Sequence, residues 1–138
     1  MLRLSKQSDY GLVLMSHFAS RDGHDVLSAR DLAEEASLPL PTVGKVLKML
    51  ARARLLSSQR GVHGGYALTR PPSEISVGAI VQALEGPIGM TDCVPDAPRN
   101  CKHEPHCPVR TPVQRINAVV RETLSQMTLE ELSPSNTR

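Results

Sequence analysis

Aromatic side chains are almost absent from this chain of 138 residues. It has no tryptophan, and Phe18, Tyr10 and Tyr66 are its only aromatic residues. Leu, Val, Ile, Met and Ala must therefore fill any core, which suits small helices packed together. Because hydrophobic residues make up 40% of the chain, a modest core can still form.

Long apolar runs are also missing. No segment approaches the roughly 18 consecutive apolar residues of a membrane-spanning helix, and residues 1–6 lack the apolar stretch of a secretory signal. We therefore expect a soluble cytoplasmic protein that does not associate with membranes.

Acidic residues are missing from one long internal stretch, residues 36–73, although the net charge of the chain is only +2. The cations of this stretch are Lys45, Lys48, Arg52, Arg54, Arg60 and Arg70. A basic segment within a nearly neutral chain indicates a local face for a polyanion such as DNA, although a solvated helix face would look similar.

Two short helices joined by a tight turn lead into this basic stretch. A first helix is expected over residues 8–21, a second from Ser28, a good N-cap, to about residue 36, and a third over residues 41–53. In the third helix Val43, Val46, Leu47 and Leu50 share one face, while Thr42, Lys45, Lys48 and Arg52 lie opposite. This arrangement is typical of a helix-turn-helix whose second helix enters the major groove.

A hairpin is expected directly after the third helix. Residues 55–59 and 66–69 read as strands, and the turn over residues 60–65 is rich in glycine. Such a hairpin is the wing of a winged helix. Arg60 at its base can reach into a minor groove, and His63 in the turn is a further candidate for contact with DNA.

The remainder of the chain predicts two further helices around an irregular segment. A fourth helix is expected over residues 77–85, and a long last helix over residues 109–127. Apolar residues recur along that last helix as a seam of Val109, Val113, Ile116, Val120, Leu124 and Met127. The seam favours a homodimer, because paired DNA half-sites call for a two-fold protein, although packing within one chain is the alternative.

The chain therefore divides into three parts. Residues 1–76 are expected to form a winged helix-turn-helix domain, with the helix-turn-helix at about 28–53 and the wing at about 55–70. Residues 77–108 hold a helix and a cysteine loop, and residues 109–138 hold the dimerisation helix and tail. The expected fold class is mainly α with a small β wing.

Three cysteines lie in the irregular segment, as Cys93, Cys101 and Cys107 with seven and five residues between them. A disulfide framework is unexpected for an odd number of thiols in a reducing compartment. Thiolates select iron–sulfur clusters, zinc or copper(I). The wide gaps favour an iron–sulfur cluster, whereas zinc completed by His103 or His106, or three unrelated thiols, remain alternatives.

The sequence resembles a known family, the IscR and NsrR group of bacterial winged-helix regulators, over nearly its whole length. The segments that carry the resemblance are residues 2–6, Arg60-Gly61 with Gly64-Gly65-Tyr66, residues 71–77, the three-cysteine loop and residues 127–132. Residues 39–43, 83–88 and 107–110 are most similar to the regulators of the SUF iron–sulfur assembly operon.

The resemblance implies a homodimer that binds promoter DNA, typically as a repressor, and carries a [2Fe-2S] or [4Fe-4S] cluster on Cys93, Cys101 and Cys107. Arg110 stands where the [2Fe-2S] member has a histidine ligand, and arginine cannot ligate iron. Asp9 matches the carboxylate that the nitric-oxide-sensing member supplies from the partner subunit, with His103 and His106 as alternatives.

Contacts to DNA are assigned to the third helix and the wing. Thr42 and Lys45 are candidates for base edges, and Lys48, Arg52 and Arg60 for phosphates or grooves. Gly44 replaces the acidic residue that tunes promoter choice in the IscR member, so discrimination by that route is not expected.

The expected function is thus a transcription regulator that senses cluster status or redox state, with control of SUF genes as its target. The alternative is a zinc-stapled DNA-binding protein without redox sensing. An enzyme is not expected, because the sequence has no C-x-x-C pair and no spacing that sets a cysteine beside a histidine and an acid.

Overall fold

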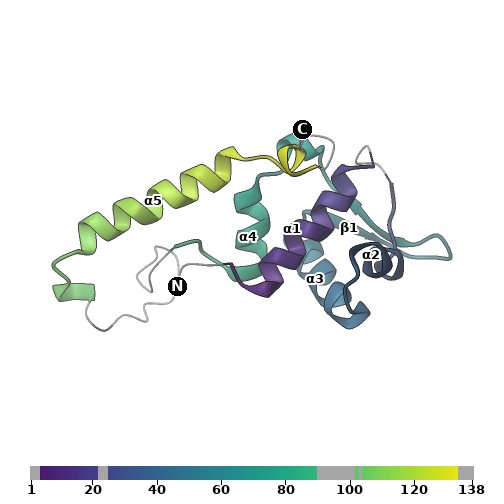
Figure 1. Ribbon diagram of the computed structural model, residues 1–138, viewed down its shortest axis with the longest axis horizontal. Coiled ribbons are helices and arrows are strands. Elements are labelled where there is room, and N and C mark those ends of the chain that lie inside the picture. The colour runs from purple at the N-terminus through teal and green to yellow at the C-terminus, as the bar shows by residue number, and fades with distance from the viewer. Residues whose placement is uncertain (1–3, 22–24, 90–101, 103, 134–138) are drawn as a thin grey trace.

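The computed structural model describes residues 4–21, 25–89, 102 and 104–133. Its elements are α1 (Lys6–Ala19), α2 (Ala29–Ala36), α3 (Leu40–Arg52), β1 (Leu56–Gln59), β2 (Gly65–Leu68), η1 (Pro72–Glu74), α4 (Val77–Glu85), η2 (Glu104–His106), α5 (Arg110–Gln126) and η3 (Leu129–Leu132). The two strands form an antiparallel hairpin (Figure 1). The predicted fold class, mainly helical with a small wing, is confirmed. None of the helices in these ranges is long and apolar enough to cross a bilayer.

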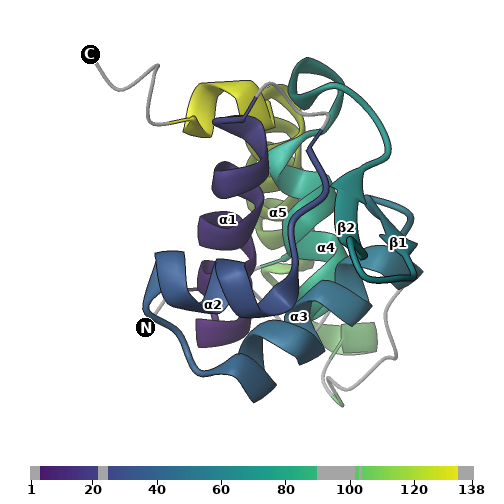
Figure 2. The ribbon, with the colours of Figure 1, turned by 90° about the vertical axis from the view of Figure 1, so that its right-hand side faces the viewer.

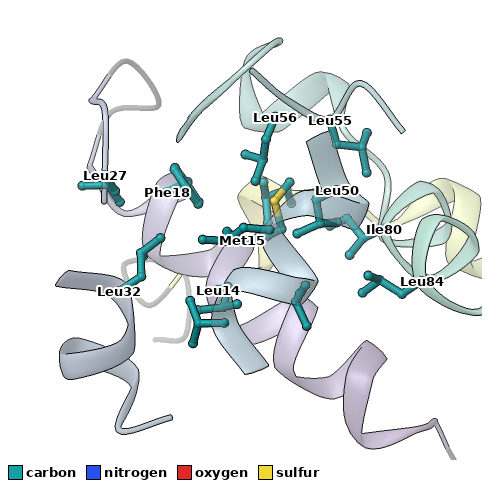
Figure 3. Close-up of a cluster of buried hydrophobic side chains, with 14 of the residues drawn as sticks. Leu14, Met15, Phe18, Leu27, Leu32, Leu50, Leu55, Leu56, Ile80 and Leu84 are labelled. Atoms are coloured by element: carbon teal, nitrogen blue, oxygen red, sulfur yellow. The ribbon is translucent and has the colours of Figure 1, made fainter. Parts of the chain in front are cut away.

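One apolar core joins the helices to the hairpin (Figure 3). Leu14 and Phe18 enter it from α1 and Leu50 from α3, while Leu56 of β1 covers the centre and Ile80 of α4 closes one side. Phe18, the only phenylalanine, is 2% exposed, and most of the other buried side chains are aliphatic. The core therefore consists mainly of aliphatic side chains, as the small number of aromatic residues predicts.

Helix α1 begins two residues before its predicted start. Ser5 is its N-cap, and the Ser5 hydroxyl accepts a hydrogen bond from the backbone N–H of Ser8 at 3.2 Å. The sequence predicts a helix that begins at Ser8, but Ser8 lies within the first turns of α1 and is fully buried. A serine at the true N-cap satisfies an amide that the helix leaves without a partner.

The turn between α2 and α3 depends on one residue with left-handed backbone. Ser37 has φ 54°, and Leu38 donates its backbone N–H to the Ala33 carbonyl at 3.0 Å. This closes the end of α2 and turns the chain by a short path into α3, which starts at Leu40. Val43, Val46, Leu47 and Leu50 are all buried, so the predicted inner face of α3 is confirmed.

The wing pairs Leu56 with Leu68 and Gln59 with Gly65. A third segment joins its edge, because Leu27 and Tyr66 exchange two backbone hydrogen bonds of 2.8 Å each. Gly65 lies where the two segments approach most closely. A Cβ added there would sit 2.4 Å from the Leu27 carbonyl oxygen.

We expect Gly65→Ala to lower the free energy of unfolding by about 2 kcal/mol, the usual scale for forcing an extra carbon into a filled site. The backbone of Leu27 cannot move aside without breaking its pairing with Tyr66. Gly44→Ala is the matched control, because a Cβ at Gly44 meets nothing within 4 Å. That change should raise stability by about 0.5–1 kcal/mol. Urea denaturation of both variants measures the contrast, and equal effects would contradict it.

Helix α5 leaves the body of the molecule and extends past α4 (Figure 1). It is tied down at its C-terminal end, where Val77 donates to the Met127 carbonyl and Leu129 donates to the Ile75 carbonyl, both at 2.8 Å. Leu129 of η3, the short helix that follows α5, is fully buried in the common core. The long helix is therefore anchored to the winged helix through its last residues.

Candidate nucleic-acid interface and cysteine site

The outer face of α3 carries the side chains predicted to meet DNA. Lys45, Lys48 and Arg52 are exposed and Thr42 is half-buried, opposite the buried Val43 and Val46. Pro39 and Pro41 start the helix, and no side chain caps its first amides. These amides and the positive end of the helix dipole are therefore available to a phosphate.

The wing presents a second set of exposed residues. Gly61, with φ 118°, bends the chain after β1, and Arg60 and His63 are exposed on either side of Val62, which is 98% exposed. Figure 2 shows α2, α3 and the hairpin on the face turned to the viewer, with α5 behind. The structure thus places the predicted contact residues at one end of the molecule. Val62 was not among them, and its exposure could not be read from a glycine-rich turn.

Neutralising these cations should weaken DNA binding without regard to sequence. For Lys48→Ala and Arg60→Ala, we expect the slope of log affinity against log salt concentration to fall by about one each if each contacts one phosphate. Binding to a random-sequence duplex at several salt concentrations measures this slope. A slope unchanged in both variants would remove α3 and the wing from the interface.

The first turn of α1 binds the end of α4 and the side of α3. The backbone N–H of Ser5 donates to Glu85 Oε1 at 2.7 Å. Gln7 Nε2 donates to Met49 Sδ at 2.7 Å and to the Leu84 carbonyl at 3.4 Å. The recognition helix is therefore connected, through one glutamine, to the residues that precede the cysteine segment. Neither contact has a sequence signature, because the partners are 42 and 77–80 residues apart.

Glu85 makes part of this connection sensitive to acid. Burial raises the pKa of its carboxyl, but hydrogen bonds from the Ser5 side chain and backbone outweigh that effect, so the pKa is lowered from 4.5. A lowered folded-state pKa stabilises the fold above pH 4.5, and the contribution is lost as pH falls through the folded value. We expect Glu85→Gln to flatten the pH dependence of unfolding between pH 6 and the acid range. Denaturation curves at several pH values test this; parallel curves for both proteins would contradict it.

The cysteine segment is described only at its end. Cys93 and Cys101 lie outside the described residues, as does His103. Cys107 is half-buried with a free thiol, just after η2 and three residues before α5, while His106 is exposed. The described residues contain no group of three metal-binding side chains.

Asp9 is exposed in the first turn of α1, one turn from the Ser5 cap. A carboxylate in this place stabilises the helix through its dipole and is free to reach a neighbouring molecule. Of the predicted ligands, the described residues thus include one half-buried thiol that is not in a disulfide, Cys107, and one exposed carboxylate, Asp9. Soft thiolates with a single harder oxygen suit iron–sulfur ligation.

A helix-turn-helix followed by a basic hairpin, with a further long helix at the opposite end, defines the class of winged-helix DNA-binding proteins. The family model "Rrf2: Iron-dependent Transcriptional regulator" matches residues 4–135, and the chain belongs to this family. It is a DNA-binding transcription regulator rather than an enzyme, and the IscR and NsrR resemblance is confirmed at the level of the family.

Individual relatives agree with this assignment. The chain is 32% identical to the regulator CymR of Bacillus subtilis over 132 residues, covering 96% of this chain and 90% of CymR. It is 30% identical to the repressor NsrR of Streptomyces coelicolor over 132 residues, covering 95% and 88%. The solved structure of B. subtilis CymR, described as a global cysteine regulator, matches all of both chains with a TM-score of 0.78. IscR of T. potens matches with a TM-score of 0.72 and 27% identity over 95% and 85% of the two chains.

Proposed function

We propose that this regulator binds promoter DNA as a homodimer and that an iron–sulfur cluster on Cys93, Cys101 and Cys107 sets its affinity for the operator. The observation that carries the proposal is the set of three soft donors leading into α5, in a chain whose family is named for iron dependence. Asp9 of the partner subunit is proposed as the fourth ligand, since Arg110 cannot ligate iron.

The dimer is supported by the face that α5 leaves uncovered. Ile116 is 46% exposed and Val119 61% exposed, although both are aliphatic. With Pro112, Arg115 and Val120 they line an apolar hollow of about 410 Å³. Of the predicted seam, Val113, Val120 and Leu124 are half-buried, whereas Val109, Ile116 and Met127 are exposed. A second copy of α5 laid along this face would cover these residues.

Within the chain, the connection described above gives the cysteine segment a route to the recognition helix. Glu85 holds the start of α1, Gln7 in that same turn contacts Met49 of α3, and residue 86 begins the segment that contains the cysteines. A bound cluster supplies a redox-sensitive crosslink among the thiolates. Binding of a cluster by the thiolates would restrict the conformation of the cysteine segment. We expect this to change the relative populations of the conformations in which α3 is placed differently against DNA.

The experiment compares operator affinity for protein purified without oxygen and for the same protein after removal of the cluster, at one salt concentration. Iron, sulfide and visible absorption are measured on each sample. We expect the two affinities to differ and acid-labile sulfide to accompany iron. Equal affinities would end the sensing proposal while leaving the DNA-binding class intact.

The target genes are proposed to be those of SUF iron–sulfur assembly, in the cytoplasm. The support is the likeness of residues 39–43, 83–88 and 107–110 to regulators of that operon. A reporter fused to that promoter should change its expression when the regulator is deleted, and an unchanged reporter would redirect the search to other promoters.

A second candidate function follows from the likeness to CymR over the whole chain. In this case the regulator would respond to the supply of cysteine rather than to an iron–sulfur cluster. The three thiols of the cysteine segment would then be free or would bind zinc. Metal analysis separates these candidates from the cluster sensor. Iron with acid-labile sulfide favours the cluster, whereas zinc without sulfide favours the second function or the zinc-stapled DNA-binding protein.

A further inference from the structure

Two arginines line an open hollow of about 510 Å³ at the base of the wing, between the end of α3, the start of β1 and the residues that follow β2. Arg54 and Arg70 are both exposed there, beside Ser57 and Thr69, with Leu56 in the wall. Both belong to the basic stretch of residues 36–73, but the sequence assigned neither of them an individual contact to DNA.

The backbone of Arg54 is in a conformation that favours glycine. Its φ is 63°, in the left-handed region. It donates its N–H to the Ala51 carbonyl at 3.0 Å, and Leu55 donates to the Leu50 carbonyl at 3.0 Å. This is the usual helix ending in which the left-handed residue is glycine. An arginine is therefore not the residue that the local structure prefers.

A second contact holds the two arginines near each other. The Thr69 hydroxyl donates to the Arg54 carbonyl at 2.7 Å, and the Thr69 N–H donates to the Leu55 carbonyl at 3.2 Å. Residue 69 is thus fixed to residue 54, so Arg70 lies next to Arg54 although 15 residues separate them in the sequence. The two side chains reach the same hollow from separate segments.

The local charge is strongly positive. Within the described ranges, no ion pair is formed by either guanidinium, and residues 36–73 contain no carboxylate. The C-terminal end of α3 contributes about half a negative charge. That dipole helps to position the arginines but offsets only part of their two charges.

We propose that Arg54 and Arg70 form a binding site for a phosphate group at the base of the wing. Guanidinium groups bind phosphate oxygens through paired N–H donors, and two of them on separate segments can bind one phosphate from two sides. The phosphate can come from a DNA backbone that passes the wing or from a free phosphate compound. Both sources present the same oxygens to the same donors.

The test uses the full chain with Arg54→Gly and Arg70→Gln, singly and together. Arg54→Gly removes the guanidinium and also relieves the left-handed backbone, so its melting temperature should rise by about 2–4 °C. Loss of binding in this variant therefore cannot come from unfolding. Lys6→Gln is the matched control, because Lys6 is an exposed cation outside the acid-free stretch.

Two probes distinguish the sources. With a random-sequence duplex, the double variant should lower the salt slope by about one if the two arginines together bind one DNA phosphate, with Lys6→Gln unchanged. With inorganic phosphate or pyrophosphate, the arginine side-chain NMR signals of the wild type should shift and saturate, and the shift should vanish in the double variant. Either result supports the site. An unchanged salt slope together with no saturating shift would overturn it.

Discussion

Replacing Cys93, Cys101 and Cys107 together by serine is expected to abolish the difference in operator affinity between cluster-loaded and cluster-free protein. Serine keeps the size of the side chain but removes the soft thiolate that iron needs. Effector couplings of this kind commonly amount to 1–3 kcal/mol, so the wild type should show at least about a fivefold difference. The triple variant should show none, with a single affinity under all oxygen and iron conditions.

The matched control is His106→Gln, an exposed side chain next to Cys107. It should keep both the cluster and the affinity difference if thiolates and Asp9 complete the ligand set. Gel-shift titrations on a duplex selected by the wild-type protein provide the affinities. A triple variant that still responds to iron or oxygen would place the sensor elsewhere in the chain.

Charging the uncovered face of α5 is expected to have an even larger effect. The double variant Ile116→Asp, Val119→Glu puts two carboxylates into the proposed contact between copies, where they would have to be desolvated against apolar side chains. The protein should become a monomer. Operator affinity should fall by about a hundredfold or more, because the second half-site no longer binds as part of one molecule.

Ala118→Glu serves as the control for added charge on the same helix. At 100° per residue, Ala118 points away from both Ile116 and Val119, and it is exposed. Sedimentation of the three proteins gives their oligomeric state, and circular dichroism verifies that each is folded. A double variant that remains a dimer would assign the contact to another surface.

The elements that depend on local pattern were predictable from the sequence. The inner face of α3 follows from the spacing of Val43, Val46, Leu47 and Leu50, since 3.6 residues per turn fixes which side chains share a face. The wing follows from glycines between two short runs of strand-forming residues. Ser28 caps α2 as expected, and its hydroxyl accepts from Asp31 at 3.1 Å.

The parts that depend on distant contacts were not predictable. Gln7 contacts Met49 only because α1 packs across α3. Some apolar residues of α5 pack against α4 and others lie on an uncovered face, and the periodicity of the sequence does not distinguish the two sets. Val119 fell outside the predicted seam although it is the more exposed neighbour of Ile116. The left-handed conformation of Arg54 is equally hidden, because glycine is the usual residue there.

The two backbone hydrogen bonds that fasten Met127 and Leu129 to residues 75–77 make α5 a lever with its pivot at the winged helix. With 17 residues, the helix is about 25 Å long. A tilt of only 5° about that pivot moves the other end, next to Cys107, by about 2 Å. In a dimer joined along α5, the converse holds. A small displacement near the Cys107 thiol would rotate the winged-helix domain about the same point, and it would change the spacing between the two α3 helices that meet the duplex.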